Sequence, residues 1–80
     1  MDDHTIAAEV DTTGLLCPLP VLKARKRLGD MAPGAVLRMV ADDPAALVDV
    51  PHFCTEQGHT LITQEEAPGG ALVFLIRKGG

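Results

Sequence analysis

Turn-forming residues divide this 80-residue sequence into six short segments, each as long as one strand or one short helix. The dividing residues are glycines, prolines and a pair of aspartates: Gly14, Pro18, Pro20, Pro33-Gly34, Asp42-Asp43-Pro44, Gly58 and Pro68-Gly69-Gly70. The sequence contains no internal repeat, low-complexity tract or linker. We therefore expect residues 1–80 to form a single domain.

Four segments have the hydrophobic pattern of strands. Residues 6–11 alternate apolar and polar side chains, and residues 36–41 form a nearly continuous apolar run. Residues 60–65 and 71–76 flank the Pro-Gly-Gly turn, which is typical of a β-hairpin.

Two segments have the 3.6-residue spacing of amphipathic helices. The first is predicted over residues 18–31. The second is predicted to begin at Pro44, with Asp42 or Asp43 as its N-cap. Pro51 removes a hydrogen bond in the middle of this helix, so we expect a kink or two helical pieces there.

The predicted order of elements is β-α-β-α-β-β, which indicates the α/β class. Such a chain folds as a two-layer sandwich, in which two helices cover one face of a four-stranded mixed sheet.

Composition excludes several classes of function. The net charge is −4 and the only aromatic residues are Phe53 and Phe74, so DNA or general nucleic-acid binding is not expected. The longest apolar run, residues 71–76, is far shorter than a membrane span. Residues 1–4 are acidic and lack the pattern of a secretory signal, so we predict a cytoplasmic protein without membrane association.

The two cysteines receive opposite interpretations. Cys54 lies on the apolar face of the second predicted helix, which favours core packing. Cys17 lies where a loop meets the first helix, and the free N–H groups of Leu19 and Val21 there favour an anion. This position predicts an exposed thiol with a lowered pKa. No Cys-x-x-Cys pair is present, so neither a zinc site nor a thioredoxin-type site is expected.

No local sequence pattern places a catalytic base beside Cys17. The histidines, at positions 4, 52 and 59, are interpreted as surface residues. A reactive thiol without a base or an enclosed pocket suggests a carrier that is loaded by one protein and unloaded by another. Lys23, Lys26 and Arg27 form a basic stripe on the first helix, which we interpret as a docking surface for acidic partners.

At these residues the sequence resembles the TusA (SirA-like) family of sulfur carrier proteins. The resemblance covers nearly the whole chain and includes the signature Cys17-Pro18-Leu19-Pro20 with the preceding Asp11 and Gly14. It also includes three later groups: Ala41-Asp42-Asp43-Pro44; Asp49, Pro51, Phe53 and Cys54; and Leu75-Ile76-Arg77-Lys78-Gly79-Gly80. The apolar Leu19 stands where acidic residues also occur in the family, which leaves the choice of partner open.

The resemblance implies the sandwich fold and a persulfide on Cys17. It also implies that Gly14, Pro18 and Pro20 are motif residues that support the position of Cys17. It implies a cysteine desulfurase or rhodanese-like donor and a DsrE-like or TusBCD-like acceptor, with no metal or organic cofactor. The sulfur commonly ends in 2-thiouridine at the tRNA wobble position; some members serve molybdenum-cofactor synthesis or sulfur oxidation. The basic residues after the signature would contact partners: Lys23, Arg25, Lys26 and Arg27. We expect a monomer.

Three alternatives remain open. The terminal Gly79-Gly80 is similar to that of ubiquitin-fold carriers with a C-terminal thiocarboxylate, although the element order differs. A redox sensor or regulatory module would oxidise Cys17 and resolve it with Cys54. A small nucleic-acid-binding module would use the basic helix.

Overall fold

The computed structural model describes residues 5–80. Its elements are β1 (Ile6–Asp11), α1 (Leu19–Gly29), β2 (Val36–Ala41), α2 (Ala46–Gln57), β3 (Thr60–Glu66) and β4 (Leu72–Arg77). The predicted order β-α-β-α-β-β is confirmed. The acidic segment of residues 1–4, with His4, lies outside the described residues.

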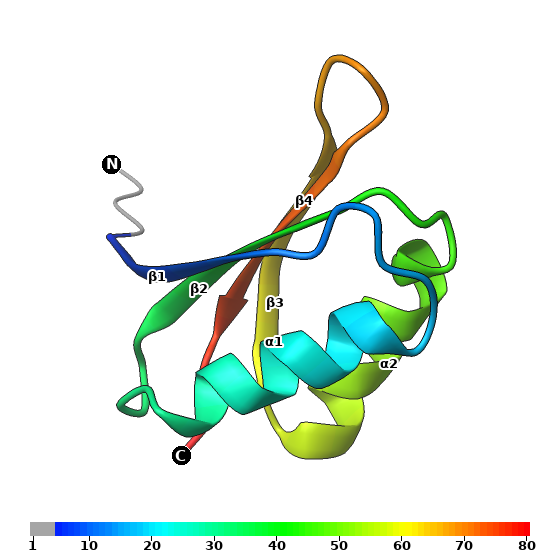
Figure 1. Ribbon diagram of the computed structural model, residues 1–80. Helices are drawn as coiled ribbons and strands as arrows, with labels where there is room; N and C mark the ends of the chain where they lie inside the picture. The colour runs from blue at the N-terminus through cyan, green and yellow to red at the C-terminus, as the bar shows by residue number, and fades with distance from the viewer. Residues whose placement is uncertain (1–4) are drawn as a thin grey trace.

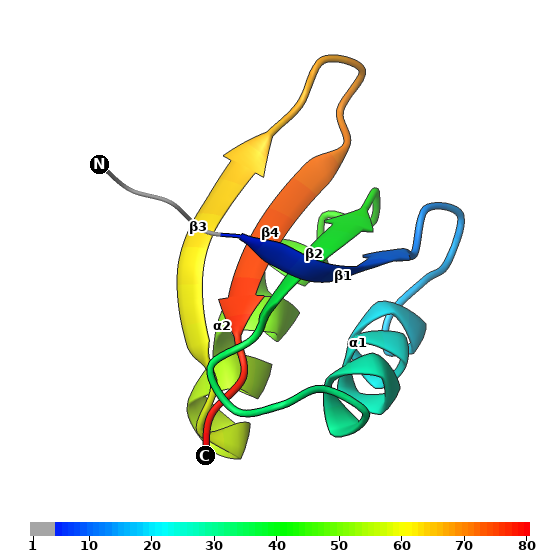
Figure 2. The same cartoon turned by 90° about the vertical axis from the view of Figure 1, so that its left-hand side faces the viewer.

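The four strands form one mixed sheet in the order β1-β2-β4-β3. β1 and β2 are parallel, and α1 connects them as a crossover. β4 is antiparallel to both of its neighbours and forms the predicted hairpin with β3. Both helices lie on one face of this sheet, α1 against β1 and β2 and α2 against β3 (Figures 1 and 2). The predicted two-layer sandwich is therefore confirmed.

The hydrophobic core lies between the sheet and the two helices. Alternate residues of β4 point into it, because successive side chains of a strand face opposite sides. The fully buried apolar side chains come from both layers: Leu37, Met39, Ala41, Phe74 and Ile76 from the sheet, Ala24 and Leu28 from α1, and Val50 from α2. The helical spacing in the sequence thus identified most of the residues that α1 and α2 bury.

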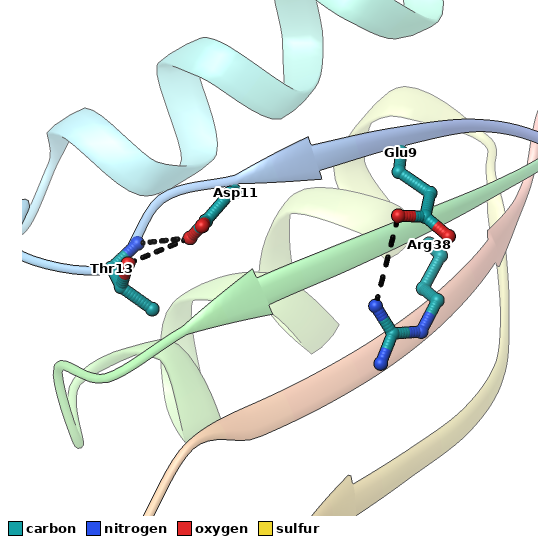
Figure 3. A network of polar contacts seen from close by, with 4 residues as sticks. All are labelled: Glu9, Asp11, Thr13 and Arg38. Atoms are coloured by element: carbon teal, nitrogen blue, oxygen red, sulfur yellow. Dashed lines mark hydrogen bonds and ion pairs between the residues drawn. The ribbon is translucent and has the colours of Figure 1, made fainter.

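Within residues 5–80, no helix covers the opposite face of the sheet. There the guanidinium Nη1 of Arg38 on β2 lies 3.9 Å from Oε1 of Glu9 on the neighbouring β1 (Figure 3). Both side chains are substantially exposed, so this ion pair contributes little to stability.

α1 is shorter than predicted at its C-terminal end. It ends at Gly29, because the N–H groups of Asp30 and Met31 donate to carbonyls three residues back and close a tight final turn. Met31 is still buried against the core.

The predicted start of the second helix at Pro44 is two residues too early. Before α2 begins at Ala46, a tight turn joins the N–H of Ala46 to the carbonyl of Asp43. Of the two outcomes expected at Pro51, division into two helical pieces does not occur, since α2 continues through it. Val50 and Cys54, buried on either side of Pro51, pack on the same core and keep both halves in one helix.

No helix within residues 5–80 combines the length and the apolar character that crossing a membrane requires.

Candidate functional site

The two loops that follow the parallel strands meet at one edge of the sheet (Figure 1). This meeting follows from the topology, because the carboxyl ends of neighbouring parallel strands lie side by side. Thr12, which is fully buried directly after β1, ties the first loop to β2: its N–H and its hydroxyl Oγ1 donate to the Val40 carbonyl at 2.8 and 2.6 Å.

Two aspartates shape the loop that leads to Cys17. Oδ1 of Asp11 accepts hydrogen bonds from the N–H and the hydroxyl of Thr13 at 2.9 and 2.7 Å, and these bonds lower the pKa of Asp11 (Figure 3). The Asp42 carboxylate accepts the N–H of Gly14, with distances of 3.0 and 3.1 Å to its two oxygens. Gly14 has a φ of 83°, a left-handed conformation that glycine adopts readily. This geometry explains why the signature includes a glycine here.

Cys17 lies in this loop, directly before the α1 N-cap, and its side chain is exposed as predicted. Its N–H donates to Oδ2 of Asp43 at 2.8 Å, and Oδ1 of the same carboxylate accepts the N–H of Ala45 at 3.0 Å. These two bonds hold the pKa of Asp43 below its usual range. The peptide bond between Cys17 and Pro18 is cis, and Pro20 is buried in the first turn of α1.

The helix start offers fewer free donors to an anion than the sequence predicted. The N–H of Leu19, one of the two expected donors, already donates to the Leu16 carbonyl at 2.9 Å. The prediction of a lowered Cys17 pKa is wrong, because acidic side chains lie around the thiol. A hydrogen bond with Asp49 is the main cause that raises the Cys17 pKa; loss of hydration and the charges of Asp49 and Asp43 add to it.

A groove of about 280 Å³ between the helices begins at Cys17. Its walls are Val21, Leu22 and Arg25 of α1 and Asp49, His52, Phe53, Glu56 and Gln57 of α2, with Pro18 at the end beside the cysteine. This groove is open to solvent and is not an enclosed pocket, which agrees with the absence of an enclosed pocket expected from the sequence.

The contribution of α2 to this groove was not predicted. The helical spacing in the sequence puts Asp49, His52 and Glu56 on the polar face of the helix, but a helical pattern does not reveal which neighbour a polar face meets. Nε2 of His52 lies 3.5 Å from Oε1 of Glu56, so the imidazole is paired within α2. Residues 49, 52 and 56 are three and four positions apart, and this spacing places their side chains on one surface of the helix. That spacing was the available signal in the sequence.

The four predicted partner-binding cations lie on two surfaces, and the predicted stripe of Lys23, Lys26 and Arg27 stays together. Arg25 lines the groove that begins at Cys17. Lys23, Lys26 and Arg27 line a separate shallow hollow beside β1, together with Val10 and Asp30. The reason is the helical period, which turns residue 25 away from residues 23, 26 and 27.

The surroundings of Cys17 are also rich in exposed apolar side chains. Leu16 is 70% exposed, and Leu19 and Leu22 are each 48% exposed. In the first turn of α2, Leu47 and Val48 are 45% and 72% exposed. The helical spacing in the sequence groups Leu47 with Val50 and Phe53 on one apolar face, but Leu47 is exposed in the structure.

Cys54 occupies the core, as predicted. It is 3% exposed on the buried face of α2, and burial raises the pKa of its thiol to about 11. Both cysteines are free. Within residues 5–80, no three His, Cys, Asp or Glu side chains gather closely enough to hold a metal ion.

The family described as sulfurtransferase TusA matches residues 8–78 of this sequence. The chain belongs to the TusA family. This finding confirms the resemblance that the signature around Cys17 indicated.

Two curated TusA relatives are the sulfur carrier proteins TusA of Pseudomonas aeruginosa strain LESB58 and of Pseudomonas paraeruginosa. Each is 40% identical over 75 residues, which is 94% of this chain and 95% of the relative. The crystal structure of a SirA-like protein from Desulfitobacterium hafniense matches with a TM-score of 0.80 at 23% identity, covering 91% of this chain and 99% of that one. This likeness establishes the shared fold.

In this TusA-family protein, the tertiary structure places an exposed thiol at the end of a groove and two carboxylates near its sulfur. Such a thiol is accessible to a sulfur-bearing group on another protein, and its reactivity depends on neighbouring charge.

Proposed function

We propose that this protein is a sulfur carrier that holds sulfane sulfur as a persulfide on Cys17. The observation that carries the proposal is the position of Cys17, exposed in a loop that hydrogen bonds hold in place, at the end of an open groove. Cys54 is buried and remains protonated at neutral pH, so it does not compete for sulfur. The chain acts as a relay partner and not as a self-contained enzyme.

In the loading step, the Cys17 thiol loses its proton and the thiolate attacks the outer sulfur of a persulfide on the donor. The S–S bond of the donor breaks, and a new S–S bond forms on Cys17. The donor sulfur leaves as a thiolate and takes up a proton, so the exchange has no net oxidation. Unloading is the same exchange, with the acceptor thiolate as the attacking group.

The proposed donor is a cysteine desulfurase or a rhodanese-like protein, and the proposed acceptor is a DsrE-like or TusBCD-like protein. Arg25 contacts these partners within the groove, and Lys23, Lys26 and Arg27 attract acidic surfaces from the adjacent hollow. The exposed leucines around the thiol, Leu16, Leu19 and Leu22, supply apolar area that a docked partner covers.

The proposed destination of the sulfur is 2-thiolation of the tRNA wobble uridine or general sulfur trafficking. These exchanges need reduced thiols, which the cytoplasm maintains. The persulfide itself is the only group that the carrier requires.

Intact-mass measurement of the reduced protein after incubation with a cysteine desulfurase and cysteine tests this function. We expect a species one sulfur atom heavier for the wild type and for Cys54→Ala, lost on reduction and absent for Cys17→Ser. Removal of Gly79-Gly80 should leave loading intact, whereas a thiocarboxylate carrier would lose it. Absence of added sulfur on the wild type, with both a desulfurase and a rhodanese as donor, would contradict the proposal.

A further inference from the structure

Two consecutive residues after β4, Lys78 and Gly79, contact the ends of both helices. The ammonium Nζ of Lys78 donates to the Met31 carbonyl at 2.7 Å, in the turn that closes α1. The N–H of Gly79 donates to Nδ1 of His59 at 3.0 Å, directly after the C-cap of α2. The C-terminal end of the chain lies where both helices finish (Figures 1 and 2). One short segment thus connects the two helices at the end of the molecule opposite Cys17.

The sheet fixes the place of Lys78. Its N–H donates to the Ala35 carbonyl, and its carbonyl accepts the N–H of Gly34, both at 2.9 Å. These bonds continue the antiparallel pairing of β2 and β4, in which Val36 faces Arg77. The Lys78 side chain is half-buried, and a cation interacts favourably with the carbonyl groups at a helix end. The Nζ bond therefore ties the end of α1 to the sheet.

The contact of His59 reaches the groove that begins at Cys17. The His59 ring packs against the Phe53 ring, with centroids 5.5 Å apart and planes tilted by 43°. Phe53 lines the groove, as do Glu56 and Gln57 in the last turn of α2. The imidazole therefore connects the C-terminal segment to the α2 wall of the groove.

The C-terminal segment also packs closely on the end of α2. A Cβ at Gly79 would overlap the carbonyl of Gly58, the C-cap residue of the helix. Gly58 has a φ of 76°, the left-handed conformation that commonly ends a helix. The backbone N–H of His59 closes this end, donating to the Cys54 carbonyl at 2.8 Å. This packing leaves little room for α2 to shift relative to β4.

We propose that Lys78 and His59 are positioning residues that hold the two walls of the groove in the arrangement that a sulfur donor recognises. The inference rests on the proposed carrier function, because it concerns the surface on which the donor docks. Walls that are held in place before docking lose less conformational freedom when a partner binds. The thiol itself is held at the other end of the helices, where the Asp43 carboxylate accepts the N–H of Cys17. Lys78 and His59 therefore act on docking and not on the reactivity of the sulfur.

The dependence of the loading rate on carrier concentration, with a cysteine desulfurase and cysteine, tests the inference. Lys78→Met removes the donor to the Met31 carbonyl. His59→Phe keeps a ring beside Phe53 but cannot accept the N–H of Gly79. We expect each change to raise the KM for the carrier severalfold and to leave kcat close to that of the wild type, because it weakens binding and not the exchange step. Lys78→Arg should restore the KM, since its guanidinium can donate to the same carbonyl.

Two control variants separate positioning from a general loss of charge or stability. Arg77→Met removes the neighbouring cation, which is exposed at the end of β4. Val73→Ala lowers stability on the uncovered face of the sheet, away from the contacts of Lys78. Both should keep the wild-type KM at a temperature at which all variants are folded. A KM increase of equal size in either control would overturn the inference.

The reactivity of the thiol is measured in the same set of proteins. The rate of Cys17 alkylation by iodoacetamide should equal that of the wild type in Lys78→Met and His59→Phe, because the loop that holds the thiol is intact. An alkylation rate that falls in proportion to the loading rate would place the effect on the sulfur and overturn the inference.

A further measurement needs no donor. The methyl resonances of Val21 and Leu22 report the α1 wall of the groove, and those of Val40, on the uncovered face of β2, serve as the reference. Lys78→Met should shift the Val21 and Leu22 methyl resonances and leave the Val40 resonances in place. Unchanged groove resonances in Lys78→Met would contradict the positioning role.

The two proposals fail separately. If neither a desulfurase nor a rhodanese loads the wild type, the carrier function fails while the methyl resonances still measure the effect of Lys78 on the groove. If loading succeeds and the KM is unchanged in both Lys78→Met and His59→Phe, the carrier function stands and the positioning role is withdrawn.

Discussion

The backbone N–H of Cys17 donates a 2.8 Å hydrogen bond to the carboxylate of Asp43, which lies 26 positions later in the sequence. The other oxygen of this carboxylate accepts the N–H of Ala45 in the turn that precedes α2. One side chain therefore connects the loop that carries the thiol to the start of the second helix. The position of Cys17 relative to the groove depends on this connection.

The Asp43 carboxylate should make stability depend on pH in the acid range. Its folded-state pKa is lowered, so its contribution is complete above the unfolded value of about 3.9 and is lost as the pH falls through the folded value. We expect Asp43→Asn to have a lower Tm than the wild type at pH 6. The difference should shrink as the pH approaches 2, and a difference that stays constant would contradict this assignment.

His59 should produce a second pH dependence, closer to neutrality. Its Nδ1 accepts the N–H of Gly79 at 3.0 Å, and burial, followed by the charge of Lys78, lowers its pKa. The stabilising contribution of the neutral imidazole is complete above the unfolded pKa of about 6.5 and is lost as the pH falls below it. The Tm of the wild type should decrease from pH 7.5 to 5.5. His59→Gln should flatten this profile, whereas the exposed His52→Gln should preserve it.

The C-terminal glycines should respond differently to substitution. A Cβ at Gly79 would overlap the backbone of Gly58 at the end of α2, whereas a Cβ at Gly80 would enter open space. Overpacking against a backbone atom predicts that Gly79→Ala costs about 1–3 kcal/mol of unfolding free energy. Gly80→Ala should stay within about 0.5 kcal/mol of the wild type in urea unfolding. Equal effects of the two changes would contradict the packing of Gly79.

The core should be sensitive at the centre of the sheet. Phe74 on β4 is fully buried, and its replacement by alanine is expected to cost about 3–5 kcal/mol. A domain of this size has a total stability of only about 4–12 kcal/mol, so Phe74→Ala should be largely unfolded in mild urea. Val73→Ala, on the opposite and uncovered face of β4, is the control. A smaller loss for Phe74→Ala than for Val73→Ala would be inconsistent with the core described above.

The separation of the basic residues predicts unequal effects on sulfur loading. Arg25 shares the groove with Cys17, whereas Lys26 lies in the hollow beside β1. Arg25→Ala should therefore lower the initial rate of loading by a desulfurase several-fold. Lys26→Ala should have a smaller effect that disappears at high salt, because exposed charges act at long range and are screened. A larger effect for Lys26→Ala would place the contact surface over the hollow instead.

Much of the fold was predictable because its signals are local. Residues 6–11 alternate apolar and polar side chains, and Ala24 and Leu28 are one helical turn apart. Each pattern defines the face of an element from residues that are close together in the sequence. The Pro-Gly-Gly turn at residues 68–70 indicated the hairpin, and the Cys-Pro-Leu-Pro signature located the thiol before a helix. The errors at the helix ends came from tight turns, whose three-residue hydrogen bonds leave no clear pattern in the sequence.

The sequence by itself determined the order of elements, the buried faces, the burial of Cys54 and the exposure of Cys17. Only the tertiary structure decided the environment of that exposed thiol. The packing of α2 beside α1 puts Asp49 in the same groove as Cys17 across a separation of 32 positions, and the Asp49 carboxylate raises the pKa of the thiol instead of lowering it. The physical reason is that a helical period defines which residues share a face, whereas electrostatic interactions depend on distances between segments that only folding establishes.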